Sequence, residues 1–385
     1  MNNSRQSLAY YRRDRYQGFR VLLPLLAPVL AMLIGCTSAI AQQTRTHHIA
    51  AVEVDWDYAP TGINQISGSA FGESENVFVR SGKERIGKVY RKALYREYTD
   101  AAFTTVKAIA PQWEHLGILG PVIRGEVGDT IQVVFKNMAS FPATIHPHGV
   151  LYAKNSEGAP YNDTTSGADK ADDAVPPGGT HTYIWEVPER AGPGPMDGSS
   201  VLWMYHAHTD EPADTNTGLV GPLIVTRKGS ANPDGSPKDI DREFVTLFTV
   251  FNENASHYLE HNVNHFTGKP KKTMKNLDDP EFQESNLMHS VNGYVYGNLP
   301  GLTMKQGERV RWYMMSIGTE VDLHTPHWHG QTILWMGSRM DMVELLPGSM
   351  KTVDMAPDNP GTWLYHCHVN DHITAGMMAL FTVTE

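Results

Sequence analysis

The chain has 385 residues, of which 41% are hydrophobic and 19% are charged, and this composition is typical of a globular protein large enough for two domains. Its formal net charge of −10 argues against a nucleic-acid-binding protein, because such proteins need a basic surface. Cys36 and Cys367 are its two cysteines, so a disulfide-rich fold is excluded.

The first 41 residues are predicted to be an export signal. Five arginines and one aspartate precede the apolar run 21–34, which is too short to span a bilayer but suits the core of a signal peptide. Two endings remain open: cleavage after Ala39-Ile40-Ala41, or a lipobox at 33–36 that would leave Cys36 lipidated. We therefore expect export to a bacterial periplasm or cell envelope, or secretion, with membrane contact only through that possible lipid anchor. The adjoining His47 and His48 are expected to be disordered.

Short β-type runs, broken by Gly, Pro, Asn and Asp, follow the leader, and no long helical periodicity separates them. They are residues 130–137, 180–188, 201–208, 244–251, 309–315 and 361–368. This pattern predicts an all-β protein with sandwich architecture. Since the polar stretch 227–241 is typical of a linker, we expect domain 1 at 42–228, a linker at 229–241 and domain 2 at 242–385.

The two halves of the chain repeat one another. EVGDTIQVVFKN (126–137), followed by HPHG, corresponds to KQGERVRWYMM (305–315), followed by HWHG. Likewise, SVLWMYHAH (200–208) corresponds to GTWLYHCH (361–368). The duplication indicates two copies of one β domain, each with two histidine-rich stretches.

Ten of the 18 histidines fall in four clusters at equivalent places in the two repeats. The clusters are His146-Pro-His148, His206-Ala-His208, His324-x-x-His327-x-His329 and His366-Cys-His368-x-x-x-His372. A lone histidine is usually structural, but a set of clusters placed equivalently in two repeats indicates metal binding.

Cys367, His372 and Met377 are spaced by five residues each, so a turn after a strand can gather them around one ion, with His324 as a fourth ligand. Two imidazoles, a thiolate and a weak thioether are the ligand set of a blue-copper site. Copper would hold Cys367 as a thiolate, which explains a cysteine without a disulfide partner in an exported protein.

Successive side chains of a strand point to opposite faces, so Cys367 can face one metal while His366 and His368 reach a second centre. Setting His324 and His372 aside leaves eight histidines, four from each half: His146, His148, His206, His208, His327, His329, His366 and His368. These eight can meet only at a boundary between a first and a second domain.

The four clusters resemble the copper signatures of the multicopper oxidases, and all twelve ligand positions match. The resemblance implies two tandem cupredoxin-like Greek-key β-sandwich domains and four copper ions per subunit. It assigns a type 1 copper to His324, Cys367, His372 and Met377, a type 2 copper to His146 and His327, and a type 3 pair to His148, His206, His208, His329, His366 and His368. Such enzymes couple one-electron oxidations of a small reductant to the reduction of O2 to water.

The first half lacks its own type 1 site, because Ala143 and Ala207 stand opposite His324 and Cys367. This resembles two-domain laccases with the blue site in domain 2, whereas copper nitrite reductases keep no complete set of eight histidines. Related two-domain proteins form rings of three subunits, which implies a homotrimer with clusters at its interfaces. The resemblance also places an acid for proton delivery at Glu157, with Tyr152 nearby.

Beyond the metal motifs, most of the chain resembles ceruloplasmin, hephaestin and the related coagulation-factor A domains. HLGILGPVIRGEVGDT (115–130) and ESNLMHSVNGYVYGNLPGL (284–302) are two of the matching segments. The iron site of ceruloplasmin implies one here at Glu284, His289 and Asp371, with Glu320 contributed by an adjacent subunit. Three carboxylates and one imidazole suit iron, so we expect Fe(II) as the reductant and ferroxidase activity.

Two alternatives remain open, and a third, a protein without enzymatic activity, is disfavoured. Laccase-type oxidation of phenols or aromatic amines needs only an open approach to the type 1 histidines. Oxidation of Cu(I) would suit the twelve methionines that follow residue 270. A copper store or an interaction module should have lost ligands of the oxygen-reducing set, yet none is missing.

Overall fold

Four β-sheets, two in each half of the chain, form the body of the protein in the computed structural model, which describes residues 43–385. The predicted export signal, its two alternative endings and Cys36 lie outside the described residues.

The larger sheet of the first half has the strand order β2-β1-β4-β7-β6, and the smaller has the order β3-β9-β8-β5. In β4, Ile131, Val133 and Phe135 are buried and the residues between them are partly exposed, because one face of this strand meets the core. The strands are β1 Thr44–Asp57, β2 Val89–Tyr98, β3 Ile123–Glu126, β4 Thr130–Asn137, β5 His146–Pro147, β6 Leu151–Tyr152, β7 Thr180–Glu186, β8 Ser200–His206 and β9 Val220–Thr226.

The second half has a sheet of order β11-β10-β13-β17-β15-β16 and a sheet of order β12-β19-β18-β14. Every residue of β13 is buried, since this strand lies inside its sheet and also contacts β8 of the first half. The strands are β10 Arg242–Asn252, β11 Leu287–Val291, β12 Thr303–Lys305, β13 Val310–Ser316, β14 Pro326–Trp328, β15 Ile333–Trp335, β16 Ser338–Met340, β17 Met350–Met355, β18 Gly361–Cys367 and β19 Met378–Thr384.

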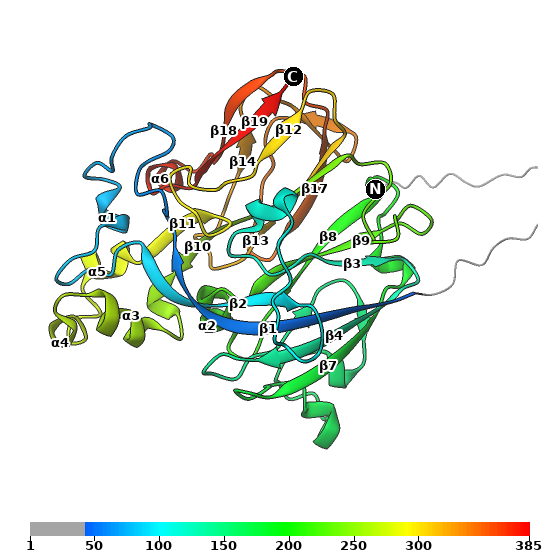
Figure 1. Cartoon of the computed structure of the whole chain (residues 1–385), viewed down its shortest axis with the longest axis horizontal. Helices are drawn as coiled ribbons and strands as arrows, with labels where there is room; N and C mark the ends of the chain where they lie inside the picture. The colour runs from blue at the N-terminus through cyan, green and yellow to red at the C-terminus, as the bar shows by residue number, and fades with distance from the viewer. Residues whose placement is uncertain (1–42) are drawn as a thin grey trace, which may run out of the picture. The chain divides into compact units, whose positions relative to one another are not determined.

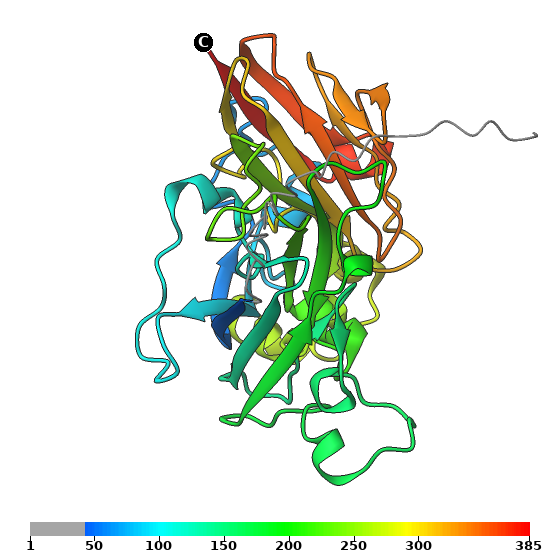
Figure 2. The ribbon, with the colours of Figure 1, turned by 90° about the vertical axis from the view of Figure 1, so that its right-hand side faces the viewer.

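The two halves share one topology. In each half, one parallel pair lies in the larger sheet (β1 with β4, β10 with β13) and one in the smaller sheet (β3 with β9, β12 with β19). This confirms the predicted all-β fold of two tandem cupredoxin-like sandwiches. In Figure 1, β12, β18 and β19 lie at the top and β4 and β7 at the bottom, and Figure 2 shows the same order from the side.

Short helices occupy the connections. They are α1 Asn76–Val79, α2 Glu211–Thr217, α3 Leu259–Phe266, α4 Pro270–Thr273, α5 Pro280–Ser285 and α6 Asn370–Thr374, with 3-10 turns η1 Pro111–Leu116, η2 Lys154–Ser156, η3 Gly167–Lys170, η4 Glu189–Ala191 and η5 Glu253–Ala255. Among residues 43–385, no helix has the length and apolar character needed to cross a membrane. Two helices matter for the site: α6 directly follows β18, and α5 directly precedes β11.

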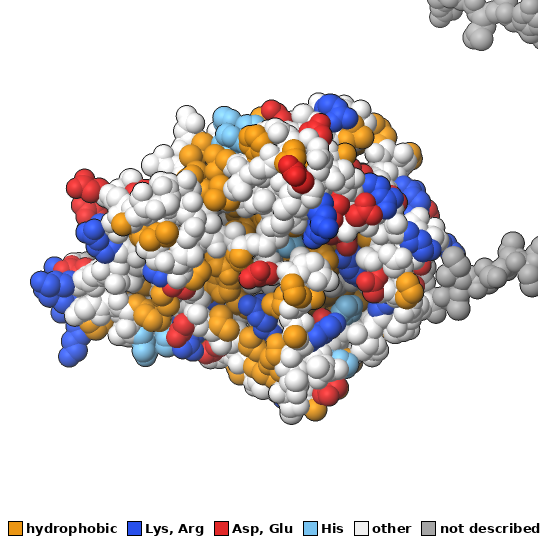
Figure 3. Space-filling view, turned by 45° about the horizontal axis from the view of Figure 1, so that its top comes forward, with side chains coloured by type: hydrophobic (Ala, Val, Ile, Leu, Met, Phe, Trp, Pro, Cys, Tyr) orange, Lys and Arg blue, Asp and Glu red, His pale blue; other side chains and the backbone are white. Residues whose placement is uncertain are grey.

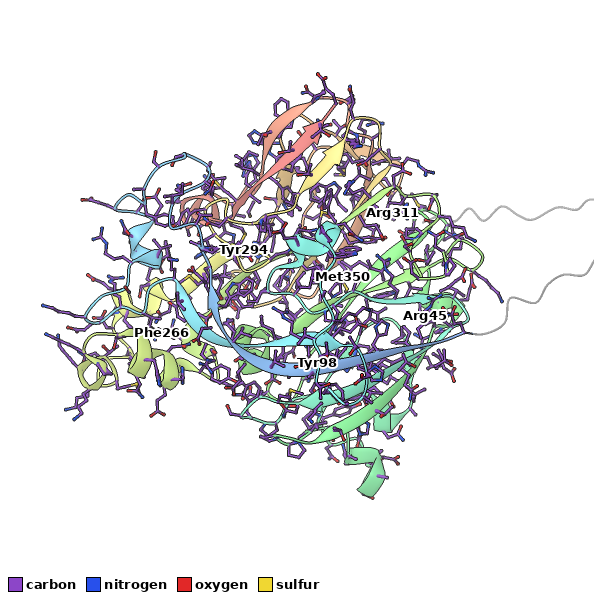
Figure 4. The ribbon with its side chains drawn as sticks, viewed as in Figure 1. Arg45, Tyr98, Phe266, Tyr294, Arg311 and Met350 are labelled. Atoms are coloured by element: carbon purple, nitrogen blue, oxygen red, sulfur yellow. The ribbon has the colours of Figure 1, made fainter. Side chains whose placement is uncertain are left out.

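Buried polar contacts join the two halves. Arg311 of β13, labelled in Figure 4, donates to Ser200 Oγ of β8 at 2.7 Å and also forms an ion pair with Asp354 of β17. Lys92 of β2 and Glu253 of η5 form an ion pair in which neither side chain is exposed to solvent. The segment between β9 and β10, predicted as a linker, contains no helix or strand.

The prediction of disorder at His47 and His48 is wrong. Both residues lie in β1, which pairs with β2 and with β4, and the pairing with β2 places His48 opposite Tyr98. The sequence signal was misleading because β1 starts immediately after the predicted leader.

The exposed charges are mixed in sign, and acidic and basic side chains are interspersed on the face shown in Figure 3.

Candidate metal centres

His324, Cys367 and His372 come together at the end of β18. Cys367 is the last residue of that strand, and helix α6 turns His372 back toward it. The Cys367 Sγ lies 3.6 Å from His372 Nδ1 and 3.9 Å from His324 Nδ1, and the two Nδ1 atoms are 3.2 Å apart. All three side chains are buried. Three donor atoms of the predicted type 1 set therefore converge on a space that one metal ion would fill.

The surroundings of Cys367 favour its thiolate form. Burial raises the pKa of this thiol, but hydrogen bonds from His324, from His372 and from the backbone N–H groups of Thr325 and Val369 lower the pKa to about 6. The thiolate is the form of cysteine that binds metals. The residue is thus prepared for a metal ion before one binds.

Met377, the predicted axial ligand, is tied to the same group through its backbone. Its carbonyl accepts the Cys367 N–H at 3.1 Å, and its own N–H donates to the His372 carbonyl at 2.9 Å. The Met377 side chain is fully buried in the apolar cluster that also contains Cys367.

A second histidine group lies at the same strand. In the antiparallel pairing of β14 with β18, His327 lies opposite His366. The ring nitrogens of His327, His329 and His366 lie close enough together to hold one ion. The His368 ring centroid is 5.2 Å from the centroids of both His327 and His366. The end of β18 therefore supplies Cys367 to the first group and His366 to the second, and His368, the residue directly after the strand, joins the second group as well.

The first half repeats this arrangement. His146 of β5 lies opposite His206 of β8, in the register that His327 and His366 have in the second half. The His146 centroid is 5.2 Å from that of His208, and the His148 centroid is 5.2 Å from that of His206. Four imidazoles from two strands and their extensions form each group.

Backbone carbonyls fix the orientation of the most buried rings. The Nδ1–H groups of His206 and His366 donate to the carbonyl of the following residue, at 2.9 and 2.6 Å. In the neutral rings the two Nε2 atoms then carry no proton. Each of these atoms lies beside a second Nε2, that of His148 at 3.1 Å and that of His329 at 3.0 Å. Nitrogens arranged in this way suit coordination to shared ions.

Burial keeps five of these imidazoles neutral at pH 7, the state in which histidine binds a metal ion. Burial lowers the pKa of His206 to about 3 and the pKa values of His148 and His366 to about 4. It also lowers the pKa values of His146 and His327.

The two histidine groups remain separate within the chain. Ring contacts join His146, His148, His206 and His208 to one another, and others join His327, His329, His366 and His368. In residues 43–385, no imidazole contact connects one group with the other. His208 is partly exposed to solvent and His368 is exposed. Each group is therefore half of the predicted set of eight.

Glu157 contacts the first histidine group through its backbone. Its carbonyl accepts the Nδ1–H of His146 at 2.7 Å, while its carboxylate binds Lys154 Nζ at 2.6 Å and Tyr161 Oη at 2.9 Å. Tyr152 lies edge-on to His146, with ring centroids 5.9 Å apart. Both residues predicted to deliver protons are therefore neighbours of this group, but the Glu157 carboxylate already has two partners.

The predicted iron residues are only partly assembled. His289 of β11 packs against His372, with ring centroids 5.1 Å apart, and Asp371 is close enough to act electrostatically on the His289 ring. Glu284 of α5 and Glu320, in the connection from β13 to β14, are exposed and have no ion pair in the described part of the chain. The fold therefore brings His289 and Asp371 to the Cys367 group and leaves both glutamates open to solvent.

Three carboxylates beside the histidines were missed by sequence reasoning. Asp322 Oδ1 lies 3.2 Å from His324 Nε2, and two other contacts are longer: Glu211 to His208 at 3.4 Å and Asp341 to His327 at 3.5 Å. The proximity of Asp322 and Glu211 to predicted ligands in the sequence was an available signal. Nothing in the sequence marks Asp341, which reaches His327 only because of the fold.

The donor atoms of both groups fit copper. The first group offers one sulfur and two imidazoles, with a thioether beside them, and the second offers imidazoles alone. Among residues 43–385, the buried Nδ1 of His327 has no hydrogen-bond partner, which is unusual for a buried nitrogen and consistent with a role in coordination.

Two family models, each described as multicopper oxidase, match residues 116–230 and 265–385. Together they cover more than half of the chain. The chain is also 44% identical over 357 residues to ferroxidase HEPHL1 of Homo sapiens, a match that covers 92% of this chain and 30% of that protein.

Human hephaestin is 46% identical over 352 residues, covering 89% of this chain and 29% of that protein. Human ceruloplasmin is 44% identical over 354 residues, covering 89% of this chain and 33% of that protein. The chain thus spans about a third of the length of these curated relatives.

Solved structures support the fold. A crystal structure of a multicopper oxidase matches with a TM-score of 0.56 and 20% identity, covering 89% of this chain and 90% of that one. Copper nitrite reductase from Nitrosomonas europaea matches with a TM-score of 0.54 and 18% identity, covering 89% and 95%. Copper is the cofactor that the two matched family models imply. The chain belongs to the multicopper oxidase family.

Proposed function

We propose that the protein is a ferroxidase, which oxidises Fe(II) next to the Cys367 group and reduces O2 to water at a histidine cluster. The observation that carries this proposal is the packing of His289 against His372, at a centroid distance of 5.1 Å, with Asp371 beside them. The likeness to ferroxidase HEPHL1 supports the same activity.

The Cys367 group and the histidine cluster have different tasks. Copper bound at His324, Cys367, His372 and Met377 would accept single electrons, and copper bound at the eight remaining ligand histidines would reduce O2. Cys367 follows His366 directly in the chain, and its carbonyl accepts a hydrogen bond from the His366 ring. Only a few bonds therefore separate the Cys367 group from the histidine cluster. This short connection supports a division into electron entry and O2 reduction.

Iron would bind on the outer side of His372. Burial lowers the pKa of His289 to about 4, so this imidazole is neutral and able to bind Fe(II) at pH 7. Glu284 and Asp371 are exposed and would add anionic oxygen ligands that favour Fe(III) over Fe(II). Glu320 would be the fourth ligand, contributed by an adjacent copy of the chain.

The complete cluster would form between copies of the chain. Each half presents four histidines, and the two groups make no contact with one another within residues 43–385. A ring in which the first half of one copy faces the second half of the next would join them, and three copies would close the ring. A homotrimer would therefore hold three clusters of eight histidines.

Protons for O2 reduction would come from acids at this interface. We retain Glu157 and Tyr152 in this role, since both lie beside His146. Glu211 and Asp341 are further candidates, because each lies next to a histidine of one half of the cluster.

The export signal, the domain bounds and the partners are proposed from the sequence. We propose an export signal at 1–41, with a lipid anchor on Cys36 as one outcome, and domains at 42–228 and 242–385 joined by a linker at 229–241. O2 and a small reductant would be the partners, without nucleic acid.

The proposal is tested by O2 consumption of the copper-loaded protein with Fe(II) or with a dimethoxyphenol as reductant. Glu284→Ala should lower the rate with Fe(II), because it removes an iron ligand, and should leave the phenol rate unchanged. Glu281→Ala is the matched control, since Glu281 lies on the same helix and its side chain is 84% exposed. A wild type that prefers the phenol, with no effect of Glu284→Ala on either rate, would make the protein a laccase instead.

A further inference from the structure

Asp322 is a buried carboxylate in an otherwise exposed segment. Its neighbours Val321 and Leu323 are 56% and 50% exposed, but Asp322 is only 1% exposed. A charged side chain is buried at this level only when its environment compensates the loss of hydration. In residues 321–323 the polar side chain is thus buried and the two apolar side chains are exposed, the reverse of the usual arrangement.

Every oxygen of this carboxylate has a partner. Oδ1 accepts the Val250 N–H of β10 at 2.7 Å, and it lies 3.3 Å from Thr249 Oγ1. Oδ2 accepts the Thr319 N–H at 2.8 Å. The remaining contact of Oδ1 is with His324 Nε2, at 3.2 Å. Backbone groups of β10 and of its own loop therefore hold the carboxylate in place, and the carboxylate in turn contacts His324.

The loop that precedes Asp322 has a glycine where a larger residue would collide with the carboxylate. Gly318 has a φ of +136°, and a Cβ at this position would lie 2.0 Å from Asp322 Oδ2. A glycine is thus required for the carboxylate to reach its position.

The contact makes the two histidines of the Cys367 group different from each other. Asp322 accepts the Nε2–H of His324, whose Nδ1 consequently faces Cys367 and His372. For His372, no hydrogen bond to Nε2 is present in the described residues, and its ring packs against His289. One histidine is fixed by a buried anion, and the other faces the side where iron would bind.

The first half offers an internal comparison. Ala143 occupies the place of His324, and both residues form an isolated bridge to the segment that precedes the next long strand. The residue two positions before Ala143 is Phe141, a buried side chain stacked on His257. The buried carboxylate is therefore found in the repeat that has the Cys367 group, and an aromatic ring replaces it in the repeat that lacks that group.

We propose that Asp322 is a positioning residue of the type 1 centre, which fixes the ring of His324 and lowers the reduction potential of the bound copper. A carboxylate that accepts the distal N–H of a ligating imidazole makes the imidazole a stronger donor, and its negative charge stabilises Cu(II) over Cu(I). The inference rests on the proposed function only in placing copper at the Cys367 group. It does not depend on the identity of the reductant.

The test is a redox titration of the copper-loaded full chain, followed through its blue absorption band. Asp322→Asn keeps the size of the side chain but removes the charge, and it should raise the midpoint potential while the band is retained. Asp278→Asn, which removes an exposed carboxylate, and Thr249→Val, which removes a neutral neighbour of Asp322, should each shift the potential far less. An unchanged or lowered potential in Asp322→Asn would overturn the inference.

A wild-type measurement covers the case in which Asp322→Asn loses its copper or fails to fold. Electron–nuclear double resonance of the type 1 Cu(II) in D2O should show one imidazole N–H that resists exchange and one that exchanges quickly. Equal exchange of both protons would overturn the inference. Absence of a blue band from the wild type would instead contradict the proposed function, so the two failures are distinguishable.

Discussion

His289 and His372 lie ring against ring, with centroids 5.1 Å apart, although they belong to β11 and α6 of the second half. Within the Cys367 group, His372 contributes Nδ1 at 3.6 Å from the sulfur. An iron ion bound to His289 would therefore be separated from the Cys367 group by one imidazole ring, that of His372. A path this short allows rapid transfer of one electron.

Replacing Cys367 by Ser should abolish the blue absorption band and lower Fe(II) turnover by more than about 100-fold. Even residues that only support a metal ligand typically cost about 10- to 100-fold when removed. Copper analysis supplies the check, because the variant should lose one copper ion per chain and keep those bound by the histidines. A variant with full copper content and an intact band would place the type 1 site elsewhere.

Light scattering coupled to size exclusion should give the mass of three chains for the copper-loaded protein. The reason is that the two groups of four histidines make no ring contact with one another within residues 43–385. A dilution series should show loss of the histidine-bound copper together with loss of the trimer, while the blue band persists. A monomer that holds four copper ions would contradict the shared cluster.

Lys92→Met should destabilise the protein by about 3–5 kcal/mol, since it leaves the Glu253 carboxyl without its counter-ion in a fully buried site. Chemical unfolding monitored by tryptophan fluorescence measures the change. Arg309→Met is the control: it breaks the exposed pair with Asp241 and should cost no more than about 1 kcal/mol. Equal losses in the two variants would mean that the buried pair has no special role.

The metal-free protein should lose stability as the pH falls from about 6.5 toward 4. Burial lowers the pKa values of His115 and His206 to about 3, so both stay neutral when folded and take up a proton on unfolding in this range. Because the unfolded state binds more protons, each histidine weakens the fold by about 1.4 kcal/mol per pH unit. Urea unfolding at a series of pH values gives the slope, and His115→Gln should reduce it by one proton. A slope unaffected by this substitution would refute the assignment of His115.

Much of the fold was predictable because its signals are local. The alternation of apolar and polar residues in 130–137 coincides with β4. The duplication of the chain predicted that the two halves would have similar strand orders. The ligand clusters could also be found from spacing, since strand geometry decides which neighbours share a face.

The parts that sequence reasoning missed depend on long-range contacts. Lys92 and Glu253 are far apart in the chain, and their pairing follows only from how the halves pack. Asp341 reaches His327 in the same way. Asp322 is two residues from the predicted ligand His324. However, the order Val321-Asp322-Leu323 would normally predict a buried pair of aliphatic side chains and an exposed acid, and the structure has the opposite.

The stoichiometry of the reaction, measured with an oxygen electrode and an Fe(III) assay on the copper-loaded protein, tests ferroxidase activity most directly. About four Fe(II) should be oxidised per O2 consumed, without hydrogen peroxide, because copper held by the histidine cluster would reduce O2 fully to water. A ratio near two with release of peroxide, or a rate no higher than that of free copper, would contradict a multicopper ferroxidase.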